Sequence, residues 1–329
     1  MTLFLGIDGG GTKTEFALID PTGRVLATRR AGPAYHVEIG MQSLQHLLTM
    51  TVSGMLASLS KSRDDIGFAF VGLPGYGENS ALLPQLDQIL EGLLPKQRYR
   101  CGNDVVCGWA GALAGAQGIA VVAGTGSIAY GEYAGRSARA GGWGELFSDE
   151  GSAFWLAREA LALFSRMNDG RAPKGPLHEL IRDHFGVTHG LDVCAKVYGP
   201  PALSRSEIAA LSPLLTHAVR AGDVLARKIF EAAAREIAAL VHAVRDALKV
   251  EPYFPLTASY CGGLMQPDSL LLPLFAQALS GSDRNYDLRP PRLTPALGAA
   301  AFAATLARTA LGAVALERLQ KNGIGEGAQ

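Results

Sequence analysis

The feature that most constrains the fold is a run of glycines directly after the first apolar segment. Residues Leu3 to Ile7 predict a buried strand that ends at Asp8, and the letters GGGTKT follow at positions 9–14. Phe16 and Leu18 then predict a second strand that turns back beside the first. Three consecutive glycines cost backbone entropy, so an ordinary hairpin rarely carries them. The sequence therefore predicts a turn whose backbone approaches a ligand closely.

The residues of this turn suit a phosphate. Successive backbone N–H groups can form a concave anion site, and the hydroxyls of Thr12 and Thr14 and the ammonium of Lys13 add donors. Asp8 would repel a phosphate unless a cation stood between them, so we interpret it as a ligand of Mg²⁺ or of Mg²⁺-bound water. A glycine-rich hairpin with an exposed polar turn is the alternative for this segment taken alone.

Two familiar phosphate-binding loops are excluded. The pattern GxxxxGK[ST] is absent from the chain, which excludes a P-loop. A dinucleotide-binding loop needs a helix after its glycines, whereas the segment here predicts a strand.

The beginning of the chain is partly repeated further along. Ile119 to Ala123 predicts an apolar strand, Gly124 to Ser127 is a second turn of glycines and hydroxyls, and Ile128 to Tyr133 predicts the returning strand. A strand–turn–strand unit used twice predicts a duplicated α/β fold whose two turns hold the phosphates of one nucleotide.

Length and charge narrow the class of protein. The chain has 329 residues, which is enough for two domains. Thirty basic and thirty acidic residues give a formal net charge of zero, so we expect neither nucleic acid nor an anionic membrane surface as a partner. The uncharged segment from Val105 to Gly131 is rich in glycine and contains the second turn, so we expect no membrane insertion.

The cysteines and the first residues predict a cytoplasmic protein. The four cysteines form neither a CxxC pair nor a cluster at zinc spacing, which favours reduced thiols. Asp8 ends the first apolar segment too early for a signal peptide.

A carboxylate near the second turn is the candidate for proton transfer. Asp104 lies between a short strand, Arg98 to Cys101, and a helix of small residues that begins at Val105. Phosphoryl transfer to an alcohol needs such a carboxylate. A helix N-cap is the alternative role, and Asn103 beside it could also cap the helix. The spacing does not decide between the two roles.

The second half of the chain predicts mainly helices. Ala153 to Phe164, Ser206 to Arg220 and Asp223 to Leu248 all have helical periodicity, which we interpret as core packing. Gly262 and Gly263 follow a possible strand and permit close approach of a flat ring or of another backbone.

Several segments together resemble a known family. They are DGGGTKTE at Asp8–Glu15, ND at Asn103–Asp104, AGTGS at Ala123–Ser127, GGWGELFSDEGSAFW at Gly141–Trp155 and CGG at Cys261–Gly263. In this order they resemble the N-acetylglucosamine kinases of the BadF/BadG type, within the actin-like sugar kinase superfamily. The resemblance extends from Leu3 to about Ala307, and the block that begins at Gly141 is its most specific part.

The resemblance implies an α/β fold of two RNase H-like (actin-like ATPase) domains, with Mg-ATP and a sugar in the interdomain cleft. We expect the first domain at residues 1–116, joined by a C-terminal helix at about 304–321, and the second, with a helical insertion, at 117–303. The implied activity is phosphorylation of the 6-hydroxyl of N-acetylglucosamine or a close relative. We expect a homodimer. We also expect its ligand to be a small-molecule sugar substrate.

The resemblance also implies roles for single residues. Asp104 would be the general base, and Asp8 would hold Mg²⁺. The phosphate-binding residues would be Gly10, Gly11, Thr12, Lys13, Gly124, Thr125, Gly126 and Ser127. Gly262 and Gly263 would lie near the adenosine. The sugar-binding residues would be Asp104, Gly142, Trp143, Asp149 and His36. Core packing is the alternative role for Trp143, helix capping for Asp149, and an unremarkable loop position for His36.

Three positions on the sugar side depart from the animal members of the family. Tyr35 replaces an asparagine, Pro74 a serine and Ala140 a cysteine. The preference for an acetamido group therefore stays open, and a glucosamine kinase or another hexose kinase of this fold is the alternative.

Two other classes share the superfamily. ATPases that activate CoA dehydratases hold an iron–sulfur cluster through cysteines, and the cysteines here occupy unrelated contexts. Sugar kinase-like repressors carry a DNA-binding domain before the first strand, whereas this chain begins with that strand, so we do not expect a repressor.

Overall fold

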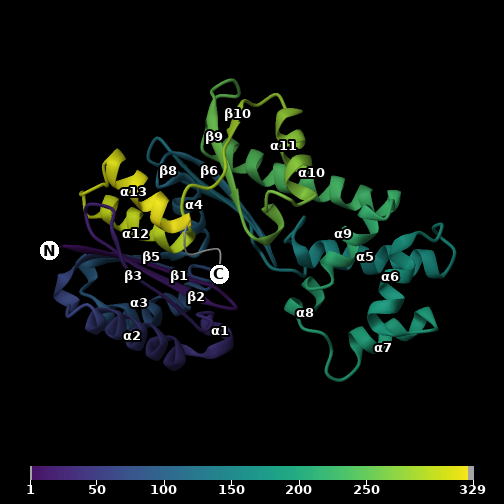
Figure 1. Cartoon of the computed structure of the whole chain (residues 1–329), viewed down its shortest axis with the longest axis horizontal. Helices are drawn as coiled ribbons and strands as arrows, with labels where there is room; N and C mark the ends of the chain where they lie inside the picture. Colours follow the sequence, from purple (N-terminus) through teal and green to yellow (C-terminus); the bar gives the residue numbers. More distant parts are fainter. Residues whose placement is uncertain (1, 325–329) are drawn as a thin grey trace. The chain divides into compact units, whose positions relative to one another are not determined.

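The chain forms two compact units, each built on a five-stranded sheet (Figure 1). The computed structural model describes residues 2–324. Unit 1 contains the residues up to Gly118 and those from Pro290 onward, and unit 2 contains residues 119–289. The prediction of an α/β fold built twice is confirmed.

The sheet of unit 1 brings three strand ends to one edge. Its order is β3-β2-β1-β4-β5. The strands are β1 (Leu3–Gly9), β2 (Thr14–Ile19), β3 (Val25–Ala31), β4 (Ile66–Leu73) and β5 (Tyr99–Asn103). β2 runs antiparallel to β1, whereas β4 and β5 run parallel to it. Asp8 pairs with Gly72, and Gly72 pairs with Gly102, so the carboxyl ends of β1, β4 and β5 lie together.

Helices cover both faces of this sheet. They are α1 (His36–Ile39), α2 (Met41–Ser58), α3 (Leu83–Leu93), α4 (Val105–Leu113), α12 (Pro295–Leu306) and α13 (Ala313–Ile324). Leu3, Leu5 and Ile7 belong to a buried cluster with residues of α2 and α3. On the other face α12 packs against β1 and α4. Successive side chains of a strand point to opposite faces, and both faces are covered here, so β1 is apolar from Leu3 to Ile7 and only then reaches Asp8.

The last helices correct the expected domain boundary. We placed residues up to 303 in the second domain, but the structure groups everything from Pro290 with unit 1. The reason is the small size of the facing residues. A Cβ added to Gly6 would lie 2.2 Å from the carbonyl oxygen of Ala296, so the backbone of α12 rests directly on β1.

Unit 2 repeats the strand order of unit 1. Its sheet has the order β10-β9-β6-β7-β8. The strands are β6 (Gly118–Ala123), β7 (Ser127–Tyr133), β8 (Arg136–Gly141), β9 (Leu256–Cys261) and β10 (Tyr286–Leu288). Strands β6 to β8 take the places of β1 to β3, and β9 and β10 those of β4 and β5. The duplication therefore extends beyond the strand–turn–strand unit.

Most of the helices of unit 2 lie between β8 and β9 in the chain. They are α5 (Ala153–Asn168), α6 (Pro176–Phe185), α7 (Val193–Tyr198), α8 (Arg205–Ala209), α9 (Ser212–Arg220) and α10 (Val224–Ala247), and α11 (Leu271–Ser280) follows β9. The single helix that we expected over 206–220 is divided into α8 and α9. Pro213 explains the division, because proline is tolerated in the first turn of a helix but not in its interior.

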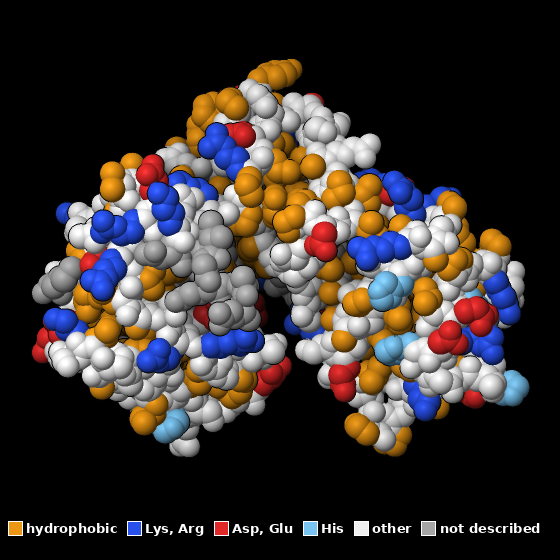
Figure 2. Space-filling view, in the orientation of Figure 1, with side chains coloured by type: hydrophobic (Ala, Val, Ile, Leu, Met, Phe, Trp, Pro, Cys, Tyr) orange, Lys and Arg blue, Asp and Glu red, His pale blue; other side chains and the backbone are white. Residues whose placement is uncertain are grey.

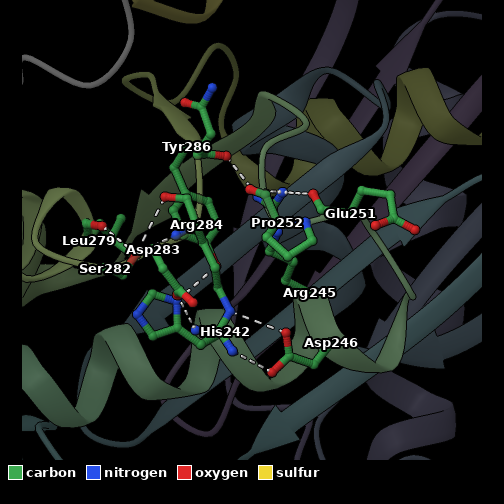
Figure 3. A network of polar contacts seen from close by, with 11 residues as sticks. His242, Arg245, Asp246, Glu251, Pro252, Leu279, Ser282, Asp283, Arg284 and Tyr286 are labelled. Carbon is green, nitrogen blue, oxygen red and sulfur yellow. Dashed lines mark hydrogen bonds and ion pairs between the residues drawn. The ribbon is translucent and has the colours of Figure 1, made fainter.

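A buried arginine fastens the end of α10 to the neighbouring loop and strand (Figure 3). Arg245 is fully buried, and its guanidinium donates hydrogen bonds to the carbonyl oxygens of Asn285 at 2.7 Å and of Phe254 at 2.7 Å. It also lies 5.0 Å from the centre of the Tyr286 ring. The Tyr286 hydroxyl is 2.8 Å from Nδ1 of His242. The buried guanidinium therefore meets carbonyl oxygens and a ring in place of a carboxylate, while its Nε has no hydrogen-bond partner among the described residues.

The distribution of charged and apolar residues agrees with two expectations from the composition, namely surface charges of both signs and no membrane insertion. Figure 2 shows basic and acidic side chains on the visible face of each unit. Among residues 2–324, no helix has the length and apolar content needed to cross a bilayer.

Two glycine substitutions test the packing of α12 on β1. Gly6→Ala should lower the free energy of unfolding by about 1–3 kcal/mol or more, because the new methyl group meets backbone atoms that cannot rotate away. Gly54→Ala in α2 is the control, since no atom lies within 4 Å of its added Cβ, and it should raise stability by about 0.5–1 kcal/mol. Denaturant unfolding measures both. Equal stabilities of the two variants would contradict this packing.

Candidate active site

Two carboxylates meet at the sheet edge of unit 1. Asp8 lies at the end of β1, and Asp104 comes directly after β5. Partial burial raises the pKa of Asp8 well above its usual range, and the negative charges of Asp104 and then Glu15 raise it further, while Lys13 opposes them. The two aspartates are therefore close enough to repel one another, which is expected if both belong to one site.

The helix-capping role falls to Asn103. Its Oδ1 accepts a hydrogen bond from the backbone N–H of Val105 at 3.2 Å, whereas the Asp104 side chain makes no capping hydrogen bond. A Cβ added to Gly72 would lie 3.1 Å from Cα of Asp104 and 2.3 Å from Sγ of Cys107, so α4 begins directly against the end of β4. Glycine at this position lets Asp104 approach Asp8.

The first glycine turn has both packed and open positions. A Cβ at Gly9 would lie 2.7 Å from the carbonyl oxygen of Gly72, and one at Gly10 would lie 2.8 Å from that of Lys13. A Cβ at Gly11 would meet no atom within 4 Å. No contact among residues 2–324 therefore requires glycine at position 11, and the space beside it is open. Thr12 and Lys13 are exposed beside it, with Lys13 in an ion pair with Glu15.

Two loops converge beside this turn. The backbone N–H of Ala34 donates to the carbonyl of Gly10 at 3.0 Å. A Cβ on Gly75 would lie 3.4 Å from the His36 ring and 3.5 Å from the Glu78 carboxylate. The predicted residue His36 thus lies in the same unit as the acidic pair, together with Glu78, which the sequence analysis missed.

His36 is held in an unusual state. It is 6% exposed, and no described residue forms a hydrogen bond with its Nδ1. Burial lowers its pKa, and the nearby Glu78 opposes that shift. A neutral, buried imidazole with an open nitrogen can exchange a hydrogen bond with a ligand hydroxyl.

The second glycine turn is tied to the start of α5. The backbone N–H of Ala153 donates to the carbonyl of Gly124 at 2.8 Å, and that of Phe154 donates to Thr125 at 3.3 Å. A Cβ at Gly124 would meet nothing within 4 Å, so this position is open as Gly11 is. Ser127 differs from the prediction that it binds phosphate. It is 1% exposed, and its N–H and hydroxyl donate to Asp149 and to the carbonyl of Glu150.

Asp149 holds this turn through a hydrogen bond to its backbone. It has a positive φ of 61° and is 2% exposed. Its Oδ1 accepts from the Ser127 N–H at 3.2 Å, and its Oδ2 accepts from Arg205 at 2.5 Å. Burial raises the pKa of Asp149, and the Ser127 N–H and Arg205 oppose the shift. The helix-capping role belongs to Ser152, whose Oγ accepts from the Trp155 N–H.

Arg205 was not predicted as a site residue. It lies in α8, and its Nε also contacts Glu145 at 3.2 Å. No local pattern signals this contact, because the residues concerned are far apart in the chain.

Trp143 lies outside the core. Its side chain is 70% exposed, and its neighbours Leu146 and Phe147 are 86% and 72% exposed. Gly142, with a φ of 70°, precedes it and packs closely on Ile128 at the start of β7. The core-packing role for Trp143 is therefore wrong.

The glycine pair after β9 borders a cavity. Gly262 has a φ of 103°, and a Cβ there would lie 2.3 Å from the carbonyl oxygen of Ala123. Gly263 is open and lines a cavity of about 290 Å³ within unit 2. Other lining residues, which the sequence analysis treated as core or passed over, are Ser212, Thr216, His217, Arg220 and Phe230.

The acidic pair fits a magnesium ion better than a metal with many protein ligands. Within residues 2–324, no group of three or more His, Cys, Asp or Glu side chains could hold a metal. Mg²⁺ is usually bound by one or two carboxylates together with waters and phosphate oxygens. Asp8, whose charged form is disfavoured by burial and by Asp104, would gain from a cation.

Comparison with known proteins identifies the family. The sequence profile described as the BadF/BadG/BcrA/BcrD ATPase family matches residues 5–303. The chain belongs to this family. Binding of ATP follows from membership of this ATPase family.

Curated relatives of this family member are sugar kinases. It is 26% identical over 312 residues to the N-acetyl-D-glucosamine kinase of Dictyostelium discoideum, with 92% of this chain and 97% of the relative covered. It is 29% identical over 252 residues to the N-acetylmuramic acid/N-acetylglucosamine kinase of Clostridium acetobutylicum, with 76% and 82% covered.

Solved structures confirm the fold. A candidate N-acetylglucosamine kinase from Chromobacterium violaceum has a TM-score of 0.69 and 25% identity, with 93% of this chain and 98% of that chain covered. A ROK family glucokinase from Streptomyces griseus has a TM-score of 0.53 and 18% identity, with 92% and 99% covered, and supports the fold alone.

The cysteines give a test of this site. Cys107 is buried, donates to the carbonyl of Ile7 at 3.4 Å, and has a pKa raised well above its usual range by burial and by Asp8 and Asp104. Cys194 is exposed. With a disulfide reagent at pH 8, Cys194 should react fastest and Cys107 only after unfolding. Cys194→Ser should abolish the fast phase, and a fast phase that persists in this variant would contradict the structure.

Proposed function

We propose that the protein is an ATP-dependent amino-sugar kinase that phosphorylates the 6-hydroxyl of N-acetylglucosamine or a close relative. The observation that carries the proposal is the pair Asp8 and Asp104 beside a turn whose Gly11 is open to a ligand. The relatives named above support the sugar as acceptor, and they favour a kinase over an activator of CoA dehydratases.

Asp104 is the proposed general base. It is partly buried at a sheet edge, and Asn103 spares it from capping α4. As the bond from the sugar oxygen to the γ-phosphorus of ATP forms, the bond from that phosphorus to the β-phosphate oxygen breaks and ADP leaves, while the hydroxyl proton passes to the Asp104 carboxylate. Asp8 would hold Mg²⁺, which when bound would supply positive charge that neutralises and orients the phosphate oxygens.

The nucleotide contacts follow from the open glycines. Gly10, Gly11, Thr12 and Lys13 in unit 1, and Gly124, Thr125 and Gly126 in unit 2, are the proposed phosphate contacts. Ser127 supports the second turn from within, because both its donors are used. The cavity beside Gly263 is the proposed adenosine site, and Gly262 shapes it through its close contact with Ala123.

The proposed sugar contacts differ in what they offer. His36 offers an open ring nitrogen, and Trp143 offers an exposed ring that can stack on a sugar face. Gly142 precedes Trp143 and packs on Ile128, and Asp149 has lone pairs beyond those that Ser127 and Arg205 use. A cytoplasmic location and a homodimer stay predictions from the sequence.

Glucosamine is the second candidate substrate. Glu78 lies beside His36, and a carboxylate there would favour an ammonium group over an acetamido group. The glucosamine kinase GspK of Vibrio cholerae is 25% identical over 241 residues, with 72% of this chain and 78% of that relative covered.

A panel of acceptors tests the proposed function. ADP release from Mg-ATP should rise strongly with one amino sugar among N-acetylglucosamine, glucosamine, N-acetylmannosamine and N-acetylmuramic acid. Glucose and a no-sugar sample are the controls. The ratio between N-acetylglucosamine and glucosamine decides the role of the acetyl group. ADP release that does not depend on sugar would contradict a kinase and favour a conformational ATPase.

A further inference from the structure

One guanidinium joins three parts of unit 2 that are distant in sequence. Nη2 of Arg205 lies 2.5 Å from Oδ2 of Asp149, and Nε lies 3.2 Å from the Glu145 carboxylate. Nη2 would also lie only 2.7 Å from a Cβ added to Gly126. The ion pair is thus packed directly against the second glycine turn.

Asp149 connects Arg205 to the turn, because it accepts a hydrogen bond from each. Its Oδ2 accepts from Arg205, and its Oδ1 accepts from the backbone N–H of Ser127. The Asp149 side chain is 2% exposed, whereas the Arg205 side chain is 41% exposed. The order of contacts is therefore α8, Arg205, Asp149 and the turn.

The helix that carries Arg205 is itself fixed. Ser204 and Glu207 form a capping box at the start of α8, with the Ser204 N–H donating to Glu207 at 2.7 Å. α8 packs against α5, whose first residue, Ala153, donates to Gly124 in the same turn. Arg205 is therefore held by α8, and the turn is held by the start of α5.

We propose that Arg205 is a positioning residue for nucleotide binding: it holds the Asp149 carboxylate in place and thereby keeps the turn from Gly124 to Ser127 in the form that receives phosphate. The inference rests on the proposed function only in assigning phosphate to this turn. Neither the sequence motifs nor the family resemblance assigns a role to Arg205.

The charges around Asp149 set the expected response to pH. Arg205 and Glu145 are the charged groups that act on it, and the Ser127 N–H is its other partner. Without the guanidinium, burial and Glu145 would raise the pKa of Asp149 further above its unfolded value. An acid with a raised pKa in the folded state destabilises the fold as pH rises from the unfolded pKa through the folded one. Loss of Arg205 should therefore cost more stability at pH 8 than at pH 5.

The first test is thermal unfolding from pH 5 to pH 8. Relative to the wild type, the deficit in Tm of Arg205→Met should grow with pH. The double variant Arg205→Met with Asp149→Asn should lack this growth, because the ionisable group is gone. Arg227→Met is the matched control, since Arg227 forms an exposed pair with Glu231 at 3.2 Å, and its Tm should follow the wild type at every pH. A deficit of Arg205→Met that does not change with pH would overturn the proposal.

The second test is the Kd for ATP, measured by calorimetry without sugar. Arg205→Met should raise this Kd by about tenfold or more, since a displaced turn loses its aligned N–H groups. Arg205→Lys keeps the charge and should recover part of the loss, which also covers the case in which the Met variant does not fold. An unchanged Kd in both variants would overturn the positioning role. No sugar is present in this measurement, so the Kd for ATP can be interpreted even if no sugar of the panel stimulates ADP release.

Discussion

The structure depends on holding two like charges at one edge of a parallel sheet. Asp8 and Asp104 repel each other, and this repulsion, together with partial burial, disfavours the charged form of Asp8. The fold enforces the arrangement through close backbone packing at Gly72, and Asn103 caps α4 so that Asp104 does not have to. A partly buried acidic pair costs stability, and the Mg²⁺ that we propose at Asp8 would relieve that cost. The same constraint would therefore favour binding of this cation together with ATP.

The two glycine turns are built in a similar way. In unit 1, Gly9 and Gly10 are packed against backbone atoms, whereas Gly11 is open. In unit 2, Gly126 is packed and Gly124 is open. The packed glycines let each turn lie close to its support, and the open ones leave space beside the turn. The difference is in the support, which is the neighbouring strand in unit 1 and the ion pair of Asp149 with Arg205 in unit 2.

Local patterns predicted the strands and both turns, because apolar periodicity and glycine runs are properties of short segments, whereas the role of Asp104 was implied by the family resemblance. What they could not predict depends on tertiary contacts. Arg205 reaches the turn across a long insertion, and α12 returns to β1 because alanine and glycine permit contact at Gly6. The cavity beside Gly263, which we propose as the adenosine site, is lined in part from α9 and α10, whose periodicity indicates only a core. Pro213 is the exception, since it was visible in the sequence and divides α8 from α9.

The central claim is that Asp104 accepts the proton of the acceptor hydroxyl. The most direct test is the rate of phosphoryl transfer in a single turnover of Asp104→Asn, with the Kd for ATP measured on the same preparation. The account predicts a rate lower by about 10² to 10⁴ and a nearly unchanged Kd, because asparagine keeps the shape of the side chain but cannot take a proton. Transfer at close to the wild-type rate would contradict it.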